Sequence, residues 1–144
     1  MQIINGDIFK VAKSGFIMHQ VNCRGAMGRG IARAFRDNYP QIFEQYRRTC
    51  AVVDKSKLLG KFEIVKLRDD LFGINSYSQL DFGTHQKQTN EDLLIRNIRK
   101  LAILSKNSGL QAYVPYRIGC ALGGGNWSLI EEELEKTDII VVKL

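Results

Sequence analysis

The sequence has little cysteine, and it lacks any long apolar run. Its three cysteines lie far apart and are odd in number, so they predict no disulfide framework, and no Cys-x-x-Cys pair indicates a zinc site. No run of about 18 apolar residues predicts a membrane-spanning helix, and the first residues lack the basic and apolar regions of a signal peptide. We therefore expect a cytoplasmic location, no membrane partner, no metal and no cofactor.

A strong excess of either charge is also missing. The 21 lysine and arginine residues outnumber the 15 aspartate and glutamate residues, which gives a net charge of +6, and the basic residues are scattered. Such an excess favours an anionic ligand. A dedicated nucleic acid-binding module needs a basic stripe with exposed aromatic residues, whereas the aromatic residues here fall mostly within apolar segments. The composition therefore argues against nucleic acid as a partner.

What the chain does contain is an alternation of strand-like and helix-like apolar periods. Its 144 residues, 44% of them hydrophobic, suffice for one core, so we expect a single domain over residues 1–144. The alternation predicts an α/β domain with helices on both faces of a mixed sheet. The predicted strands are 1–4, 16–22, 61–67, 71–78, 110–116 and 138–144, with a hairpin between the third and fourth. The predicted helices are 28–40, 41–50, a long one opened by a capping box at Thr89 and Asp92 and ended by Gly109, and 127–136.

Two loops rich in glycine each connect a predicted strand to a predicted helix. They are NCRGAMGRG at 22–30 and RIGCALGGGNW at 117–127. In open α/β sheets the ligand crevice lies beyond the carboxyl ends of the strands, and backbone N–H groups at a helix start attract anions. Two such loops at one edge of the sheet could grip a diphosphate between them. The alternative is that the glycines serve only tight turns.

Taken together, four stretches resemble the macro domain family, which binds ADP-ribose. They are NGDIF at 5–9, IMHQVNCRGAMGRGIARAF at 17–35, SQLDFG with TNEDL within 78–93, and VPYRIGCALGGGNW at 114–127. They are similar to the branch with ADP-ribose-1''-phosphate phosphatases and ADP-ribosyl-ester hydrolases more than to the branch carrying Asn-Ala-Ala-Asn. The resemblance implies a three-layer α/β/α sandwich with a mixed, roughly six-stranded sheet.

The resemblance also implies which residues contact the ligand. Asp7 would accept a hydrogen bond from the adenine amino group, or it could be a turn acid. Asn22 would bind the distal ribose, or it could cap its own turn. The remaining contacts would come from the backbone of Ile8 at the adenine, of Gly28, Gly30 and Ile31 at the ribose and phosphates, and of Gly119, Cys120, Ala121, Leu122 and Gly123 around the diphosphate, where Cys120 matters for its size.

Two side chains match catalytic positions in phosphatase-like members of the family. Histidine suits acid–base chemistry near neutral pH, so His19 and Asp81 could share the activation of water and the protonation of the leaving group. The structural alternatives are a buried strand histidine and a turn acid. His85, in the polar stretch that follows, is predicted to be solvent-exposed.

The sequence thus predicts a hydrolase that binds ADP-ribose and removes a distal-ribose substituent, most simply the phosphate of ADP-ribose-1''-phosphate. A lysine–aspartate mechanism known in the family is not supported, because Gly123 stands where the aspartate would be. Arg24, near the place of a second asparagine, favours a terminal phosphate. The alternatives are a reader that binds free or protein-linked ADP-ribose without turnover, and a hydrolase that removes ADP-ribose from protein or DNA. An ADP-ribosylated protein would then be a partner.

Overall fold

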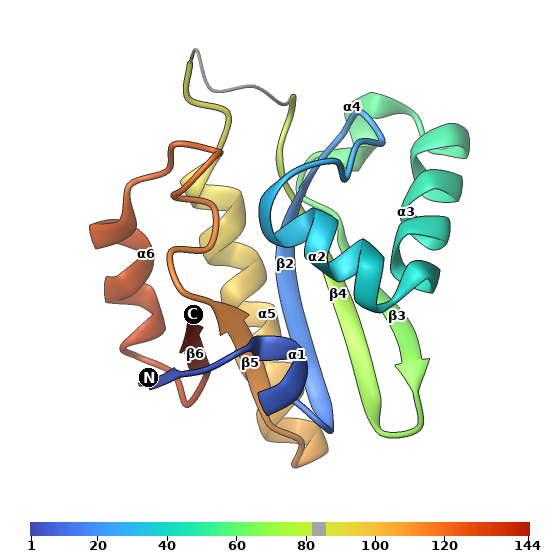
Figure 1. Ribbon diagram of the computed structural model, residues 1–144. Helices are drawn as coiled ribbons and strands as arrows, with labels where there is room; N and C mark the ends of the chain where they lie inside the picture. The colour runs from blue at the N-terminus through green and yellow to red at the C-terminus, as the bar shows by residue number, and fades with distance from the viewer. Residues whose placement is uncertain (82–85) are drawn as a thin grey trace.

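A six-stranded sheet forms the middle layer of the structure, a computed structural model that describes residues 1–81 and 86–144 (Figure 1). The predicted exposure of His85 therefore lies outside the described residues. The spatial order of the strands is β1-β6-β5-β2-β4-β3, and every neighbouring pair is parallel except β3 and β4. The bounds are β1 (Gln2–Asn5), β2 (Gly15–Asn22), β3 (Phe62–Arg68), β4 (Leu71–Gln79), β5 (Ala112–Pro115) and β6 (Ile140–Lys143).

The β3–β4 hairpin follows from the short connection between these strands. Only Asp69 and Asp70 separate them, which is too short for the crossover that a parallel pair requires. Asp70 has a φ of 64°, a left-handed conformation that aspartate tolerates better than most residues. The predicted hairpin is confirmed, and it places the one antiparallel strand of the described sheet at an edge.

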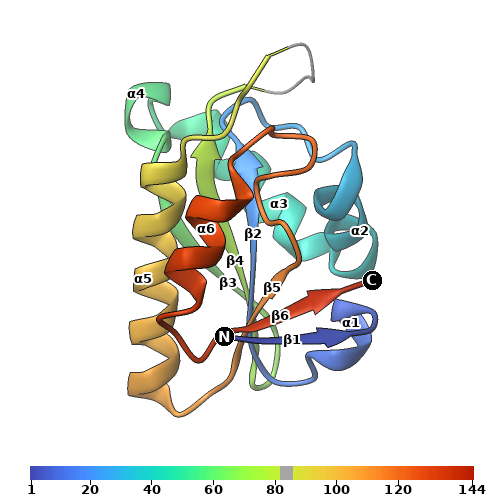
Figure 2. The ribbon, with the colours of Figure 1, turned by 90° about the vertical axis from the view of Figure 1, so that its left-hand side faces the viewer.

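Helices cover both faces of the sheet (Figure 2). Along β2, Ile17 packs into the core on the side of α2 and α3, and Met18 packs into the core on the side of α5 and α6, because successive strand residues face opposite ways. The predicted mixed sheet in a three-layer sandwich is confirmed. The helices are α1 (Ile8–Val11), α2 (Gly30–Asn38), α3 (Pro40–Val52), α4 (Lys55–Leu58), α5 (Glu91–Ser108) and α6 (Trp127–Leu134).

The start of the long helix α5 differs from the prediction by one residue. Asn90 is the N-cap, and its side chain accepts a hydrogen bond from the Leu93 amide at 3.1 Å. The predicted capping box at Thr89 and Asp92 is wrong, because the Thr89 hydroxyl bonds instead to the backbone oxygen of Gly119 at 2.6 Å. The predicted end is confirmed, since Gly109 caps the helix with a φ of 74°.

The two shortest helices could not be recognised as patterns in the sequence. Helices α1 and α4 have four residues each, too few to show an apolar period, and the side chains of Asp7 and Asp54 cap them. No helix within the described part of the chain is long and apolar enough to cross a membrane.

Candidate functional site

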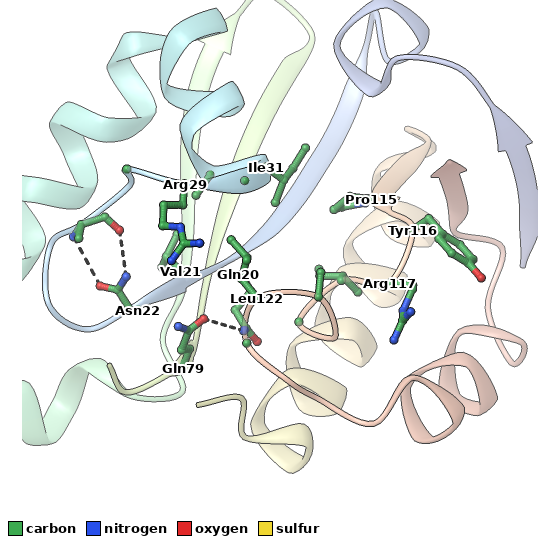
Figure 3. A pocket seen from close by; sticks show the side chains of 18 residues that line it. Gln20, Val21, Asn22, Arg29, Ile31, Gln79, Pro115, Tyr116, Arg117 and Leu122 are labelled. Carbon is green, nitrogen blue, oxygen red and sulfur yellow. Dashed lines mark hydrogen bonds between the residues drawn. The ribbon is translucent and has the colours of Figure 1, made fainter. Parts of the chain in front are cut away.

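A cleft of about 370 Å³ opens at the carboxyl ends of β2 and β5, between the two glycine-bearing loops (Figure 3). This volume is typical of a small-ligand site. The parallel order of β2 and β5 brings the loops to the same edge of the sheet, although they lie far apart in sequence. The predicted meeting of the two loops is therefore confirmed. The cleft is lined by residues 20–22, 26, 28–32, 79, 115–119 and 121–123.

Most of the predicted backbone contacts lie on this cleft. Gly30 begins α2 with a φ of 61°, and a Cβ added there would stand 3.0 Å from the Leu122 side chain, so the two loops nearly touch at this point. The predicted site residues that line the cleft are Asn22, Gly28, Gly30, Ile31, Gly119, Ala121, Leu122 and Gly123.

Asp7, Ile8 and Cys120 do not line the cleft. The Asp7 carboxylate accepts from the Phe9 amide at 3.0 Å, as a helix cap, and Ile8 is buried in the core under α2. Their adenine contacts stay a prediction. The Cys120 thiol donates to the Ile118 carbonyl at 3.3 Å, and burial raises its pKa to about 11. The thiol is therefore protonated and a poor nucleophile near neutral pH.

His19 lies in the interior of the sandwich, not on the cleft. Its side chain is 0% exposed, its ring packs on Phe35 with centroids 4.4 Å apart, and Nε2 lies 2.6 Å from Oδ1 of Asn75. Burial lowers the pKa of His19 to about 4, so the ring is neutral near pH 7. The structure does not place this side chain on the cleft, because the pleat turns it toward Phe35 of α2, and its catalytic role stays a prediction. The structure supports the alternative of a buried strand histidine.

Asp81 is also absent from the lining of the cleft. Its carboxylate pairs with the guanidinium of Arg24 at 3.0 Å, and the Gln79 side chain donates to its backbone oxygen. The pair joins the first glycine-bearing loop to the end of β4. Arg24, predicted to attract a terminal phosphate, is engaged by this carboxylate. The predicted His19–Asp81 acid–base pair is thus not assembled in the cleft.

Gln20, which lines the cleft, fastens the second loop to the sheet. Its Nε2 donates to Thr89 Oγ1 at 2.8 Å and to Gln79 Oε1 at 3.0 Å, and its Oε1 accepts from the Ser78 hydroxyl at 2.8 Å. The Thr89 hydroxyl in turn donates to the Gly119 carbonyl. No motif in the sequence predicted this network. Its signal was a glutamine inside a central strand, where a buried polar side chain requires partners.

The glycines of the second loop are needed for packing against this network. A Cβ on Gly119 would lie 2.7 Å from the Leu94 side chain and 2.9 Å from Gln20 Oε1. A Cβ on Gly123 would overlap Thr89 Oγ1. The alternative that the loop requires glycine for its own folding is therefore supported at these two positions. Gly28 differs, because a Cβ there would meet no described atom within 4 Å, and it faces the cleft.

Asn22 both shapes its own turn and lines the cleft. Its Oδ1 accepts from the Arg24 amide at 2.9 Å, and its Nδ2 donates to the Ala26 carbonyl at 2.9 Å, as Figure 3 shows for the latter bond. The predicted cap of the turn is confirmed, and its side-chain amide still borders the cavity.

The charge around the cleft is positive. Arg29 and Arg117 are exposed and line it from the two loops, and no carboxylate is among the described residues that line it. Within 1–81 and 86–144, no three His, Cys, Asp or Glu side chains form a group that could hold a metal ion. The geometry can therefore attract an anion through arginine side chains, loop amides and the first turn of α2.

No family model matches the chain. The chain is 30% identical over 142 residues to a DNA ADP-ribosyl glycohydrolase of Mycobacterium tuberculosis, which covers 90% of this chain and 36% of that protein. It is 22% identical over 167 residues to an ADP-ribose 1''-phosphate phosphatase of Meyerozyma guilliermondii, with 98% and 95% covered. A phosphatase of the same name from Neosartorya fischeri is 45% identical over 47 residues, and the match spans only 24% of its length.

Solved structures share the fold over the whole chain. A macrodomain protein from Streptomyces coelicolor has a TM-score of 0.76 at 22% identity, with 99% of each chain covered. Thermosipho africanus DarTG, solved in complex with ADP-ribose, has a TM-score of 0.74 at 22% identity and covers 100% of this chain and 42% of its own.

Proposed function

Because the chain belongs to the macro domain family, we propose that it binds ADP-ribose in the cleft and hydrolyses a substituent on the distal ribose. The observation that carries this proposal is the cleft itself, which lies between two helix-entering loops at the carboxyl ends of the parallel strands β2 and β5. Its positive lining suits a diphosphate, and the open space at Gly28 lets a ligand approach the backbone.

The diphosphate would lie between the two loops. The nine-residue helix α2 begins at Gly30, so its first amides and its dipole point toward the cleft. Backbone amides of Gly119 to Gly123 would contact the other side, and Arg29 and Arg117 would neutralise the charge. Asn22, at the end of β2, would bind the distal ribose, as the family resemblance implies.

We propose that the hydrolysis relies mainly on electrostatic stabilisation by these loop amides and arginines. We assign His19 no role in this reaction, because its side chain is buried in the core and its lowered pKa leaves the ring neutral near pH 7. Asp81 stays the proposed proton-transfer group: it follows Gln79, a residue of the cleft, by two positions, and would first have to exchange its Arg24 partner for substrate or water.

The substrate class has two candidates, each favoured by a relative. The phosphatase aligned along nearly the whole chain favours the phosphate of ADP-ribose-1''-phosphate. The relative that is 30% identical favours removal of ADP-ribose from DNA. Release from protein, and a cytoplasmic location, are further proposals that rest on the sequence.

The test begins with calorimetry, in which the protein is titrated with ADP-ribose. It continues with phosphate release from ADP-ribose-1''-phosphate and with ADP-ribose release from modified DNA and modified protein, measured in parallel. We expect binding and turnover of one substrate. The absence of a binding heat at millimolar ADP-ribose would contradict the whole proposal. Binding without turnover of any of these substrates would support the alternative of a protein that binds ADP-ribose and hydrolyses nothing.

A further inference from the structure

The hydroxyl of Tyr46, from helix α3, lies inside the turn formed by the first glycine-bearing loop. The side chain is 0% exposed. Its hydroxyl oxygen is 2.7 Å from Oδ1 and 2.8 Å from the backbone oxygen of Asn22, and it accepts a hydrogen bond from the Gly25 amide at 3.0 Å. One phenol thus contacts both ends of the turn, from a residue 24 positions along the chain.

These contacts determine which way the Asn22 amide points. Oδ1 faces the Tyr46 hydroxyl and the Arg24 amide at short range and the Ala26 amide at 3.5 Å, all of them donors, so the nitrogen must take the opposite side. Nδ2 donates to the Ala26 carbonyl at 2.9 Å, the one acceptor it has among the described residues. An amide nitrogen carries two hydrogens. The second N–H is therefore available to a ligand in the cleft that Asn22 lines (Figure 3).

We propose that Tyr46 is a positioning residue that directs this N–H of Asn22 toward the hydroxyls of the distal ribose. The inference rests on the proposed function, which puts that sugar at Asn22. Without the phenol, Oδ1 keeps the Arg24 amide at 2.9 Å and the longer contact with the Ala26 amide at 3.5 Å, and the Gly25 amide loses its acceptor. The turn and the amide are then less restrained, and the ribose loses a well-directed donor.

Tyr46 is itself rigidly placed, which a positioning role requires. Its ring packs against that of Tyr77, with centroids 5.7 Å apart, and against Phe43 at 6.5 Å. Tyr77 in turn donates to Oε1 of Glu63 at 2.8 Å. The phenol of Tyr46 is therefore fixed by the packing between α3 and β4, and not by the loop that it restrains.

Tyr77 provides a matched control. It is as buried as Tyr46, it belongs to the same cluster, and its hydroxyl is also hydrogen-bonded, but to Glu63 and not to Asn22. Replacing either tyrosine by phenylalanine removes one buried hydroxyl from the same cluster. Only the Tyr46 change touches the Asn22 amide.

Calorimetry of the wild type, Tyr46→Phe and Tyr77→Phe with ADP-ribose and with ADP tests the inference. ADP lacks the distal ribose, so the ratio of the two affinities reports on the Asn22 end of the cleft. Loss of one directed hydrogen bond corresponds to about a 3-fold to 10-fold weakening. We expect this loss for ADP-ribose with Tyr46→Phe, an unchanged affinity for ADP, and an unchanged ratio with Tyr77→Phe.

The possible results distinguish a failure of this inference from a failure of the proposed function. If the wild type prefers ADP-ribose but Tyr46→Phe weakens both ligands equally, or neither, Tyr46 has no positioning role although the proposed function stands. If the wild type fails to bind ADP-ribose, both are wrong. Should Tyr46→Phe not fold, NMR of the wild type decides. The Tyr46 Cζ resonance should then shift with ADP-ribose and not with ADP, while that of Tyr77 stays unchanged, and equal shifts would overturn the inference.

Discussion

At the scale of single residues, the interior of the sandwich holds a group of polar side chains that satisfy one another. Glu63 accepts from the hydroxyls of Thr49 and Tyr77 and from Nδ2 of Asn75, so its buried carboxylate is surrounded by neutral donors. Asn75 Oδ1 is left to accept from His19, which requires that His19 carries its proton on Nε2. Such pairing is what a buried polar group needs to be tolerated, and within this group Nδ1 of His19 is the buried atom that has no hydrogen-bond partner among the described residues.

The burial of His19 predicts a pH dependence of stability. Its pKa is about 4 in the folded protein and 6.5 for a histidine exposed to water, so between these values the unfolded chain binds a proton that the folded one does not. The unfolding free energy should therefore fall as pH drops from 6.5 to 4, by about 3 kcal/mol from this residue. Above pH 6.5 its contribution is constant.

The variant His19→Gln separates this effect from catalysis. Glutamine does not titrate, so urea unfolding at pH 4.5 and pH 7 should show a smaller difference than in the wild type. Turnover of the folded variant should stay within a few-fold of wild type, because His19 does not line the cleft. A hundredfold loss of turnover with normal stability, the effect typical of a lost general base, would contradict this assignment.

At the scale of elements, the two loops use glycine for different reasons. In the second loop, Gly119 and Gly123 make room for Gln20, Leu94 and Thr89. In the first loop, Gly28 has no such neighbour. The sequence showed two similar glycine-bearing bends, and only the contacts distinguish a glycine required by folding from one that leaves space for a ligand.

Alanine substitutions should separate these roles. Gly123→Ala places a methyl group against Thr89 Oγ1, and we expect it to lower the unfolding free energy by about 1–3 kcal/mol. Gly28→Ala should leave stability within about 0.5 kcal/mol and still weaken ADP-ribose binding. Thermal unfolding and calorimetry measure the two effects. Unchanged binding by Gly28→Ala would show that the ligand does not pass over this residue.

The link between β2 and the second loop gives a further test. Thr89→Val keeps the shape of the side chain but removes the hydroxyl that bonds Gln20 and the Gly119 carbonyl. We expect a loss of about 1–3 kcal/mol of stability, since one N–H of the buried Gln20 amide loses its acceptor, whereas the Gly119 carbonyl keeps the Gly125 amide as a donor. Ser128→Ala serves as the control, because Ser128 is an exposed residue of α6 and its hydroxyl forms no side-chain hydrogen bond within the described part of the chain. A neutral effect of Thr89→Val would contradict the role of this network.

At the scale of the whole molecule, the parallel pairing of β2 with β5 in the mixed sheet brings distant loops to one edge. The strand order places β2 beside β5, and the cleft lies where their following loops diverge. Both loops line the same cleft. A ligand bound there should therefore stabilise the folded state of the whole domain.

Ligand binding should therefore raise the thermal midpoint. At an ADP-ribose concentration 100 times the dissociation constant, mass action adds about 2.7 kcal/mol to the unfolding free energy. For a domain of this size that corresponds to roughly 5–15 °C. Differential scanning calorimetry with increasing ADP-ribose measures the shift. A midpoint that does not move with concentration would show that the folded cleft does not bind this ligand.

The sequence by itself determined the class of fold, the alternation of elements and the position of both loops, because apolar periods and glycine positions are local properties of a chain. It could also suggest Asn22 and the backbone contacts. It could not decide whether His19 is a catalytic residue or a buried strand residue. A shift of one position along β2 turns a side chain to the opposite face of the sheet, and the sequence does not fix that position. Only the tertiary structure decided that Gln20, Thr89 and Tyr46 support the site, because their partners lie on other elements and meet them only when the sandwich is packed.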